Sequence, residues 1–339
     1  MKAFFFLQVC ILSFVQVVSD KVDNKADDIH RDLQVSVWPT RTNPTTKPYD
    51  RTRPPTRNPT RNPTRNPTIK KSPLMTSKPT TPGFVCPTTS PPTNSLNIAC
   101  SFIQAPSLEE CKSTLYASSF IAGTIPTEIG LLTQLTRLDM TYGLEETIPS
   151  SISCLAQLNY LYIGSSELTG TIPEALSRLT KLTYLDISFT RLQGSIPKSF
   201  SNLVALQQLV IHNNRFFGTI PPSFSALTKL THLSMNNNFL SGTIPSSLSK
   251  LSRLISVEIM NNKLIGSIPS ALSSLTNLEG LYLSSNQLTG TLPMSVINML
   301  FLKEIFITEN NMIGSISSCG GKTIYVDCVE IICSCCTSC

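Results

Sequence analysis

Apolar residues recur along most of the chain with a period of 24 residues. Each period closes on the phrase Gly-x-Ile-Pro or a near variant, and its prolines are Pro173, Pro197, Pro221, Pro245, Pro269 and Pro293. Ahead of each phrase apolar and polar side chains alternate, as at Leu233 and Met235, which predicts a short β-strand. A fixed period of this length predicts a solenoid whose strands form one parallel sheet.

Polar residues also recur at a fixed place in the period. Where the chain leaves each predicted strand, the sequence has Asn214, Asn238, Asn262, Asn286 and Asn310. An amide both donates and accepts, so this ladder can satisfy backbone groups that the turn buries. Ser119, Ser166 and Thr190 hold the same place in earlier turns, and their hydroxyls can fill part of that role. The proline of each phrase predicts a short 3-10 or helical segment on the convex side.

Read together, these positions give Leu-x-x-Leu-x-Leu-x-x-Asn-x-Leu-x-Gly-x-Ile-Pro, most clearly from Leu230 to Leu248. The chain therefore resembles the plant-type extracellular leucine-rich repeat family, which includes receptor-like kinase ectodomains and polygalacturonase-inhibiting proteins. The resemblance covers roughly 110–318. It implies an α/β repeat solenoid of about nine 24-residue turns, with a parallel sheet on the concave face. It also implies a peptide, glycan or protein ligand.

The N-terminal part of the chain differs in composition from the repeats. Residues 1–19 combine Lys2 with an apolar run and small residues, which is typical of a secretory signal peptide; a retained N-terminal anchor is the alternative. Residues 20–37 form a short segment, and residues 38–93, rich in Pro, Thr and Arg, are expected to be a disordered stalk. No later segment holds the ~20 apolar residues of a membrane span, so we expect a secreted protein in the extracellular space or cell wall.

Charge is concentrated in the predicted stalk. The whole chain has a net charge of +6. Residues 38–85 hold ten Lys or Arg against Asp50, a net +9, whereas 86–339 hold 13 basic and 15 acidic residues, a net −2. The stalk could bind an anionic wall polymer by charge, or be a solvated spacer that carries O-linked glycans. Nucleic acid is not expected as a partner of a secreted chain.

Ten of the 11 cysteines lie outside the predicted signal peptide. They are Cys86, Cys100, Cys111, Cys154, Cys319, Cys328, Cys333, Cys335, Cys336 and Cys339. An even number in a secreted chain predicts disulfides, with the pairings open. We expect an N-terminal cap at 86–122, the solenoid at 111–318 and a cysteine-rich cap at 319–339, which resembles that of secreted microalgal members of the family. Cys154 either joins the N-terminal cap or stays free, and zinc in the C-terminal cluster is the weaker alternative, so we expect no cofactor.

The candidate binding residues are those that point outward from the predicted strands. They are Asp139, Tyr142, Tyr160, Tyr162, Tyr184, Asp186, Phe189, His212 and His232. Aromatic rings rimmed by polar groups are typical of protein interfaces and sugar platforms, although tyrosines are also ordinary strand residues. His212 and His232 would lie about 13 Å apart along the strand direction, too far to share a metal.

We expect no enzymatic activity from this face. Asp139 and Asp186 would lie about 10 Å apart, near the upper limit for the carboxylates of an inverting glycosidase. An open solenoid face, however, neither excludes water nor raises the pKa of a carboxylate.

These features predict a secreted or cell-surface module that binds a protein, peptide or polysaccharide through its concave face. The alternatives are a cell-wall or matrix structural protein tethered by the basic stalk, an inhibitor of a secreted hydrolase, and an ectodomain that acts with a membrane co-receptor. A further column of hydroxyls could template water, as on ice-binding solenoids, although the resembled family has Ser or Thr there. The column is Thr147, Thr171, Ser195, Thr219, Thr243, Ser267, Thr291 and Ser315.

Overall fold

The computed structural model describes residues 86, 99, 101, 116–119, 123–140, 143–327 and 331–336. All of them belong to the unit that runs from Ser77 to Cys339. The predicted signal peptide, the N-terminal segment and the stalk up to residue 85 lie outside the described residues. So do Tyr142 and four of the cysteines, which are Cys100, Cys111, Cys328 and Cys339.

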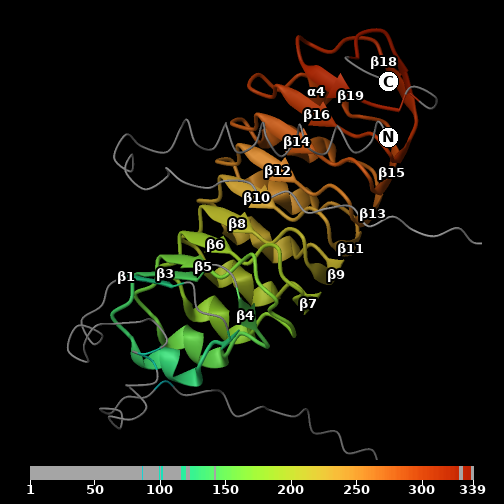
Figure 1. The fold of residues 1–339 in the computed structure, drawn as a ribbon. Coiled ribbons are helices and arrows are strands. Elements are labelled where there is room, and N and C mark those ends of the chain that lie inside the picture. The colour runs from blue at the N-terminus through green and yellow to red at the C-terminus, as the bar shows by residue number, and fades with distance from the viewer. Residues whose placement is uncertain are drawn as a thin grey trace, which may run out of the picture. The chain divides into compact units, whose positions relative to one another are not determined.

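Ten parallel strands stack along the solenoid and form what we call the main sheet (Figure 1). In order they are β1 (Tyr116–Ser119), β3 (Arg137–Met140), β5 (Tyr160–Tyr162), β6 (Tyr184–Asp186), β8 (Gln208–Val210), β10 (His232–Ser234), β12 (Ser256–Glu258), β14 (Gly280–Tyr282), β16 (Glu304–Phe306) and β19 (Thr323–Tyr325). Equivalent repeat positions lie side by side, so that Leu161 is opposite Leu185. The sequence predicted about nine turns; β19 adds a strand inside the region that we expected to be only a cap.

Short helical segments follow the prolines, as the sequence predicted. The described residues include the 3-10 helices η1 (Thr127–Leu131), η2 (Ser150–Cys154), η3 (Glu174–Arg178), η4 (Lys198–Asn202), η5 (Pro222–Ala226), η6 (Ser246–Lys250) and η7 (Ser270–Ser274), and the α-helix α4 (Met294–Ile297). Pro173, for example, has a φ of −62° and its carbonyl accepts from the Leu176 N–H at 3.0 Å. Proline suits this place because its φ is already near the helical value and its missing N–H is not needed.

A second sheet, which the sequence analysis did not predict, lies between the main sheet and the proline of each turn. Its six parallel strands are β7 (Gln193–Ser195), β9 (Arg215–Thr219), β11 (Phe239–Gly242), β13 (Lys263–Gly266), β15 (Gln287–Gly290) and β17 (Asn311–Met312). Two further pairs join β2 (Gly123–Thr124) to β4 (Leu144–Glu145) and β18 (Gly314–Ile316) to β20 (Ile331–Cys333). Successive turns are therefore connected by backbone hydrogen bonds at two places.

The glycine of each phrase contacts the preceding turn. Gly242 has a φ of +75°, and a Cβ added there would lie 2.8 Å from the Cγ2 methyl of Thr219. A side chain would be strained by the backbone conformation and would also collide with that methyl group. The Ser and Thr residues of the hydroxyl column are exposed in all eight turns. Their Cβ and methyl groups therefore act as spacers between turns.

The core is a continuous column of leucine and isoleucine, with Phe200, Phe216 and Phe224 fully buried in the middle turns. The recurring asparagines connect this core to the turn backbone. The Oδ1 of Asn262 accepts from the Leu240 N–H at 2.9 Å, and its Nδ2 donates to the Met235 carbonyl at 3.0 Å. In an earlier turn the Ser166 hydroxyl makes only one such contact, to the Ile163 carbonyl at 3.2 Å.

Three disulfides involve described cysteines. They join Cys86 to Cys154, Cys319 to Cys335, and Cys333 to Cys336. The Cys154 thiol is therefore not free, and it connects residue 86 to the convex helix η2. The Sγ atoms of Cys319, Cys333 and Cys335 lie within 4.8 Å of one another, but each belongs to a disulfide and cannot serve as a zinc thiolate. Within the described part of the chain, no helix has the length and apolar character that crossing a membrane requires.

Candidate functional site

Two columns of side chains point outward from the main sheet, on either side of the buried central residue of each strand. The first outward column is Arg137, Tyr160, Tyr184, Gln208, His232, Ser256, Gly280, Glu304 and Thr323. The second outward column is Asp139, Tyr162, Asp186, Val210, Ser234, Glu258, Tyr282, Phe306 and Tyr325. Because the register is constant, a ligand that runs across the strands meets neighbours within one column.

Three members of the first column form a continuous stack at the N-terminal end of the sheet. The rings of Tyr160 and Tyr184 are parallel to within 6°, with their centroids 4.4 Å apart. The guanidinium of Arg137 lies over the other side of Tyr160, 3.6 Å from the ring centroid. We call this group the Arg–Tyr stack. Both stacking contacts are favourable, and together they hold the three planar groups in one orientation.

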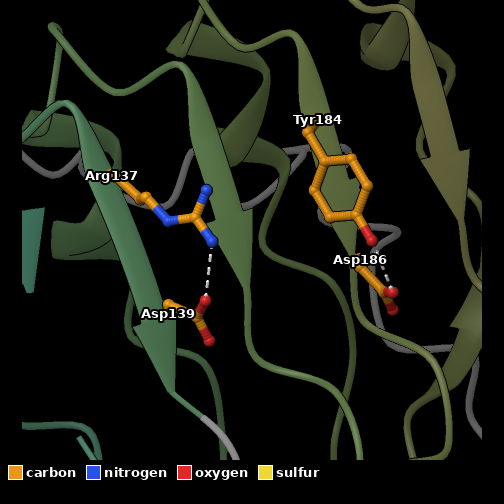
Figure 2. Close-up of polar contacts among 4 residues, drawn as sticks. All are labelled: Arg137, Asp139, Tyr184 and Asp186. Carbon is orange, nitrogen blue, oxygen red and sulfur yellow. Dashed lines mark hydrogen bonds and ion pairs between the residues drawn. The ribbon is translucent and has the colours of Figure 1, made fainter. Parts of the chain in front are cut away.

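Aspartates of the second column hold the two ends of the Arg–Tyr stack (Figure 2). Arg137 donates to Asp139 at 2.9 Å, and the Tyr184 hydroxyl donates to Asp186 at 3.0 Å. The other oxygen of Asp186 accepts from the Ser188 N–H at 2.9 Å and from its hydroxyl at 2.6 Å. Asp186 is buried, and its carboxylate is thus fully engaged. Tyr162 lies between the two aspartates, so they have separate partners instead of sharing a reaction centre.

Burial changes the titration of the stack. Loss of hydration raises the pKa of Tyr184, and the nearby charge of Asp186 together with their hydrogen bond raises it further. Burial also raises the pKa of Tyr160, although the Arg137 charge opposes this. Both phenols therefore stay protonated at any physiological pH. The stack offers neutral aromatic surfaces and hydroxyl donors, not a general base.

Phe189 lies at the edge of this region in an unusual backbone conformation. Its φ is +52°, and its side chain is 55% exposed. A bulky residue at positive φ is an outlier, because its Cβ crowds the backbone. The rings of Phe189 and His212 contact each other edge to face, with their centroids 4.9 Å apart. Phe189 also lines a shallow depression with Gly143, Ser165, Ser166 and Glu167.

The remaining predicted residues have local partners. Tyr162 shares a hydrogen bond with Ser165 at 3.2 Å. The ring of His212 contacts Phe189 and the Asn213 amide, whereas His232 starts β10 and contacts the Thr231 hydroxyl at 3.0 Å. Burial lowers the pKa of both histidines, opposed at His212 by the charge of Asp186. The two histidines belong to different parts of the face, and they share no partner among the contacts described.

Sequence reasoning missed a second aromatic group at the C-terminal end of the second column. The rings of Tyr282 and Phe306 lie 5.2 Å apart, and those of Phe306 and Tyr325 lie 4.1 Å apart at an angle of 20°. Next to them Glu258 is buried and accepts from Ser234, Asn236 and Ser256 at 3.0–3.2 Å. Burial raises the pKa of this carboxyl, and the three hydrogen bonds partly oppose the shift.

Comparison with known proteins agrees with this geometry. Two family models described as leucine rich repeat match residues 156–216, and 229–251 with 277–299. The ectodomain of the receptor kinase GASSHO1/SCHENGEN3 from Arabidopsis thaliana, solved with CASPARIAN STRIP INTEGRITY FACTOR 2, is 33% identical with a TM-score of 0.58. The match covers 65% of this chain and 26% of that one. The family-model matches and this neighbour support the plant-type extracellular leucine-rich repeat family.

Two other solved structures resemble the leucine-rich repeat solenoid. The Arabidopsis receptor kinase HAESA, in complex with an extended IDA peptide hormone, is 30% identical with a TM-score of 0.58, over 62% of this chain and 37% of that one. A plant ice-binding protein is 29% identical with a TM-score of 0.50, over 61% of this chain and 74% of that one. The matched part of this protein thus spans between a quarter and two fifths of the length of these two receptor ectodomains. No curated protein sequence matches it.

The leucine-rich repeat period carried a signal for the residues that were missed. Arg137 occupies the same repeat position as Tyr160 and Tyr184, so its place in the stack follows from the register. Tyr282 and Phe306 share the position of Asp139 and Tyr162 in later turns. Tyr325 could not be found in this way, because its turn lacks the Gly-x-Ile-Pro phrase.

Proposed function

We propose that this leucine-rich repeat protein is an extracellular recognition module that binds a peptide, or an extended segment of a partner protein, through the Arg–Tyr stack and Phe189. The observation that carries the proposal is the fixed stack of Arg137, Tyr160 and Tyr184 on an open sheet. Its side chains are already ordered by one another and by the aspartates, so a ligand would bind at little further entropic cost.

Several features favour a peptide ligand. A shallow face with aromatic rings and engaged carboxylates can accept an extended chain, but it encloses no small molecule. Aromatic and arginine side chains are also the commonest energetic anchors of protein interfaces. The resembling ectodomains of GASSHO1/SCHENGEN3 and HAESA were solved with a peptide factor and a peptide hormone, and HAESA also with the co-receptor SERK1. Disulfides and this likeness both favour action outside the cell, with a membrane co-receptor as a second partner.

The test is a pull-down from an extracellular fraction with the wild-type chain and a Tyr160→Ala, Tyr184→Ala double variant. Phe239→Ala is the matched control, because it removes an exposed ring from the second sheet instead of the main sheet. The double variant should lose a partner that the control retains, and bound partner should slow amide exchange over residues 137–189. An identical partner list for all three proteins, each shown by circular dichroism to be folded, would refute the proposal.

Ice binding is a second candidate, supported by the exposed hydroxyl column and by the likeness to a plant ice-binding protein. The hydroxyls repeat once in each turn, but the neighbouring exposed positions vary and include Phe217, Ile265 and Ile313. Thermal hysteresis measurements on the wild type and on a Thr219→Lys, Thr243→Lys variant decide the matter. Hysteresis that is present in the wild type and lost in the variant would establish this function.

A further inference from the structure

The second aromatic group lies at the opposite end of the main sheet from the Arg–Tyr stack. Tyr282, Phe306 and Tyr325 follow one another on β14, β16 and β19, and all three rings are half-buried. Their centroid distances of 5.2 and 4.1 Å make them one connected aromatic surface. We call this group, together with Glu304, the C-terminal aromatic subsite.

Gly280 makes the position of the first ring possible. A Cβ added at Gly280 would lie 2.4 Å from Cε2 of Tyr282 and 2.7 Å from its hydroxyl oxygen. The ring therefore lies against the backbone of its own strand, in space that any other residue would fill. From there the Tyr282 hydroxyl donates to Oε2 of Glu304 at 2.7 Å. The exposed carboxylate is thus held beside the aromatic surface.

The outward columns around the subsite are acidic. From β10 to β19 the two outward columns hold the carboxylates Glu258 and Glu304 and no lysine or arginine. Lys303, which precedes β16, is paired with Glu279 at 2.7 Å, and Lys322, which precedes β19, donates to the Gly320 carbonyl at 3.3 Å. A ligand group of positive charge is therefore complementary to this end of the sheet, and an anionic polymer is not.

The N-terminal end of the same face shows what such a group could be. There the guanidinium of Arg137 lies on the Tyr160 ring and donates to the Asp139 carboxylate. At the C-terminal end the aromatic rings and the carboxylate are present, but the first outward column supplies no arginine: its members are Gly280, Glu304 and Thr323. Among the described residues of these two columns, none completes the same arrangement of cation, ring and carboxylate there.

We propose that the C-terminal aromatic subsite binds an arginine or lysine side chain of a peptide ligand. The cation lies over an aromatic face of the subsite, as Arg137 does over Tyr160, and donates to the Glu304 carboxylate, which Tyr282 holds in place. The inference deepens the proposed function, because it adds a second contact point and a charge requirement for the same extended ligand.

The experiment measures binding of an acetylated, amidated tetra-arginine peptide to the full chain by isothermal titration calorimetry. Tetraglutamate and the uncharged oligosaccharide cellohexaose are the comparison probes. Glu304→Gln removes the charge but keeps an acceptor for Tyr282, and should weaken tetra-arginine binding about fivefold to tenfold. Tyr325→Leu keeps apolar volume but removes the ring, and should weaken it about twofold to fivefold.

Glu309→Gln is the matched control. Glu309 lies close to Glu304 in the chain, and its carboxylate accepts from the Ser285 hydroxyl instead of from Tyr282. Its replacement by glutamine changes the net charge by the same amount as Glu304→Gln. Glu309→Gln should change the affinity for tetra-arginine less than twofold, because salt screens a distant charge. Three outcomes would each overturn the proposal. They are equal effects of Glu304→Gln and Glu309→Gln, no binding of tetra-arginine, and binding of cellohexaose that is tighter than that of tetra-arginine. The Tyr160→Ala, Tyr184→Ala variant should still bind tetra-arginine, so failure of the proposed function is recognised separately by the pull-down.

Discussion

Variants of Phe189 can test its backbone strain separately from the role of its ring in binding. Its equivalents in the other turns also have φ between 51° and 56°, but they are Ser165, Asn213, Asn237, Asn261, Ser285 and Glu309. We predict that Phe189→Asn is more stable than Phe189→Ala by about 1 kcal/mol. Both variants delete the ring and its contact with His212, worth about 0.5–1 kcal/mol at a half-exposed site. They differ because asparagine tolerates positive φ, whereas alanine retains most of a strain of roughly 1–2 kcal/mol.

The measurement is thermal unfolding of the three proteins side by side. For a folded region of about 200 residues, 1 kcal/mol corresponds to a Tm difference of roughly 2–4 °C. Phe189→Asn should unfold within about 2 °C of the wild type, because the relieved strain offsets the lost ring contact. Equal Tm values for the Asn and Ala variants would refute the strain argument. Equal partner capture by the wild type and Phe189→Asn would instead refute the role of the ring in binding.

Three further predictions concern the scaffold. Asn262→Ala leaves the buried Leu240 N–H without its acceptor and should lower the free energy of unfolding, measured by urea titration, by about 2–4 kcal/mol. An unchanged midpoint of urea unfolding would contradict the stabilising role of the asparagine ladder. Burial raises the pKa of Glu258, so the folded state binds the carboxyl proton more tightly than the unfolded state does. Protonation of Glu258 therefore adds to the free energy of unfolding at acid pH, and this contribution is lost as pH rises through the folded pKa. Glu258→Gln should therefore stabilise the protein near pH 7 but not near pH 4, and a pH-independent difference would show another cause. Cys154→Ser breaks the bond to Cys86 and should speed amide exchange only in the turns near η2, because each turn of a solenoid contacts only its neighbours; faster exchange throughout would contradict this.

The period predicted the main sheet and the convex helices because both repeat in every turn with the same residue types. Leucine at one position and proline at another leave little choice of geometry, and the register then places Tyr160 beside Tyr184. The second sheet was not predicted, because its exposed residues vary from Phe239 to Lys263 to Gln287, and the alternation of exposed and buried positions is therefore not visible as an alternation of polar and apolar residues.

The candidate site could be predicted only in part, for a different reason. Repeat position tells which side chains share a face, but not which ones touch. The lateral bond from Arg137 to Asp139 and the edge contact of Phe189 with His212 depend on side-chain rotamers and on a positive φ. The pairing of Cys86 with Cys154 spans 68 residues of sequence and does not follow from the repeat period.

The contact between the Gly242 backbone and the Thr219 methyl has a consequence for how such a chain can change in length. Each contact of this kind joins a turn only to its immediate neighbour, and the same pair recurs as Gly170 with Thr147 and Gly194 with Thr171. Duplication or deletion of one whole 24-residue unit therefore leaves every remaining junction intact. The array can gain or lose a unit in evolution without repacking, and the distance between the Arg–Tyr stack and the C-terminal aromatic subsite would change by one strand spacing, about 4.8 Å, at each such event.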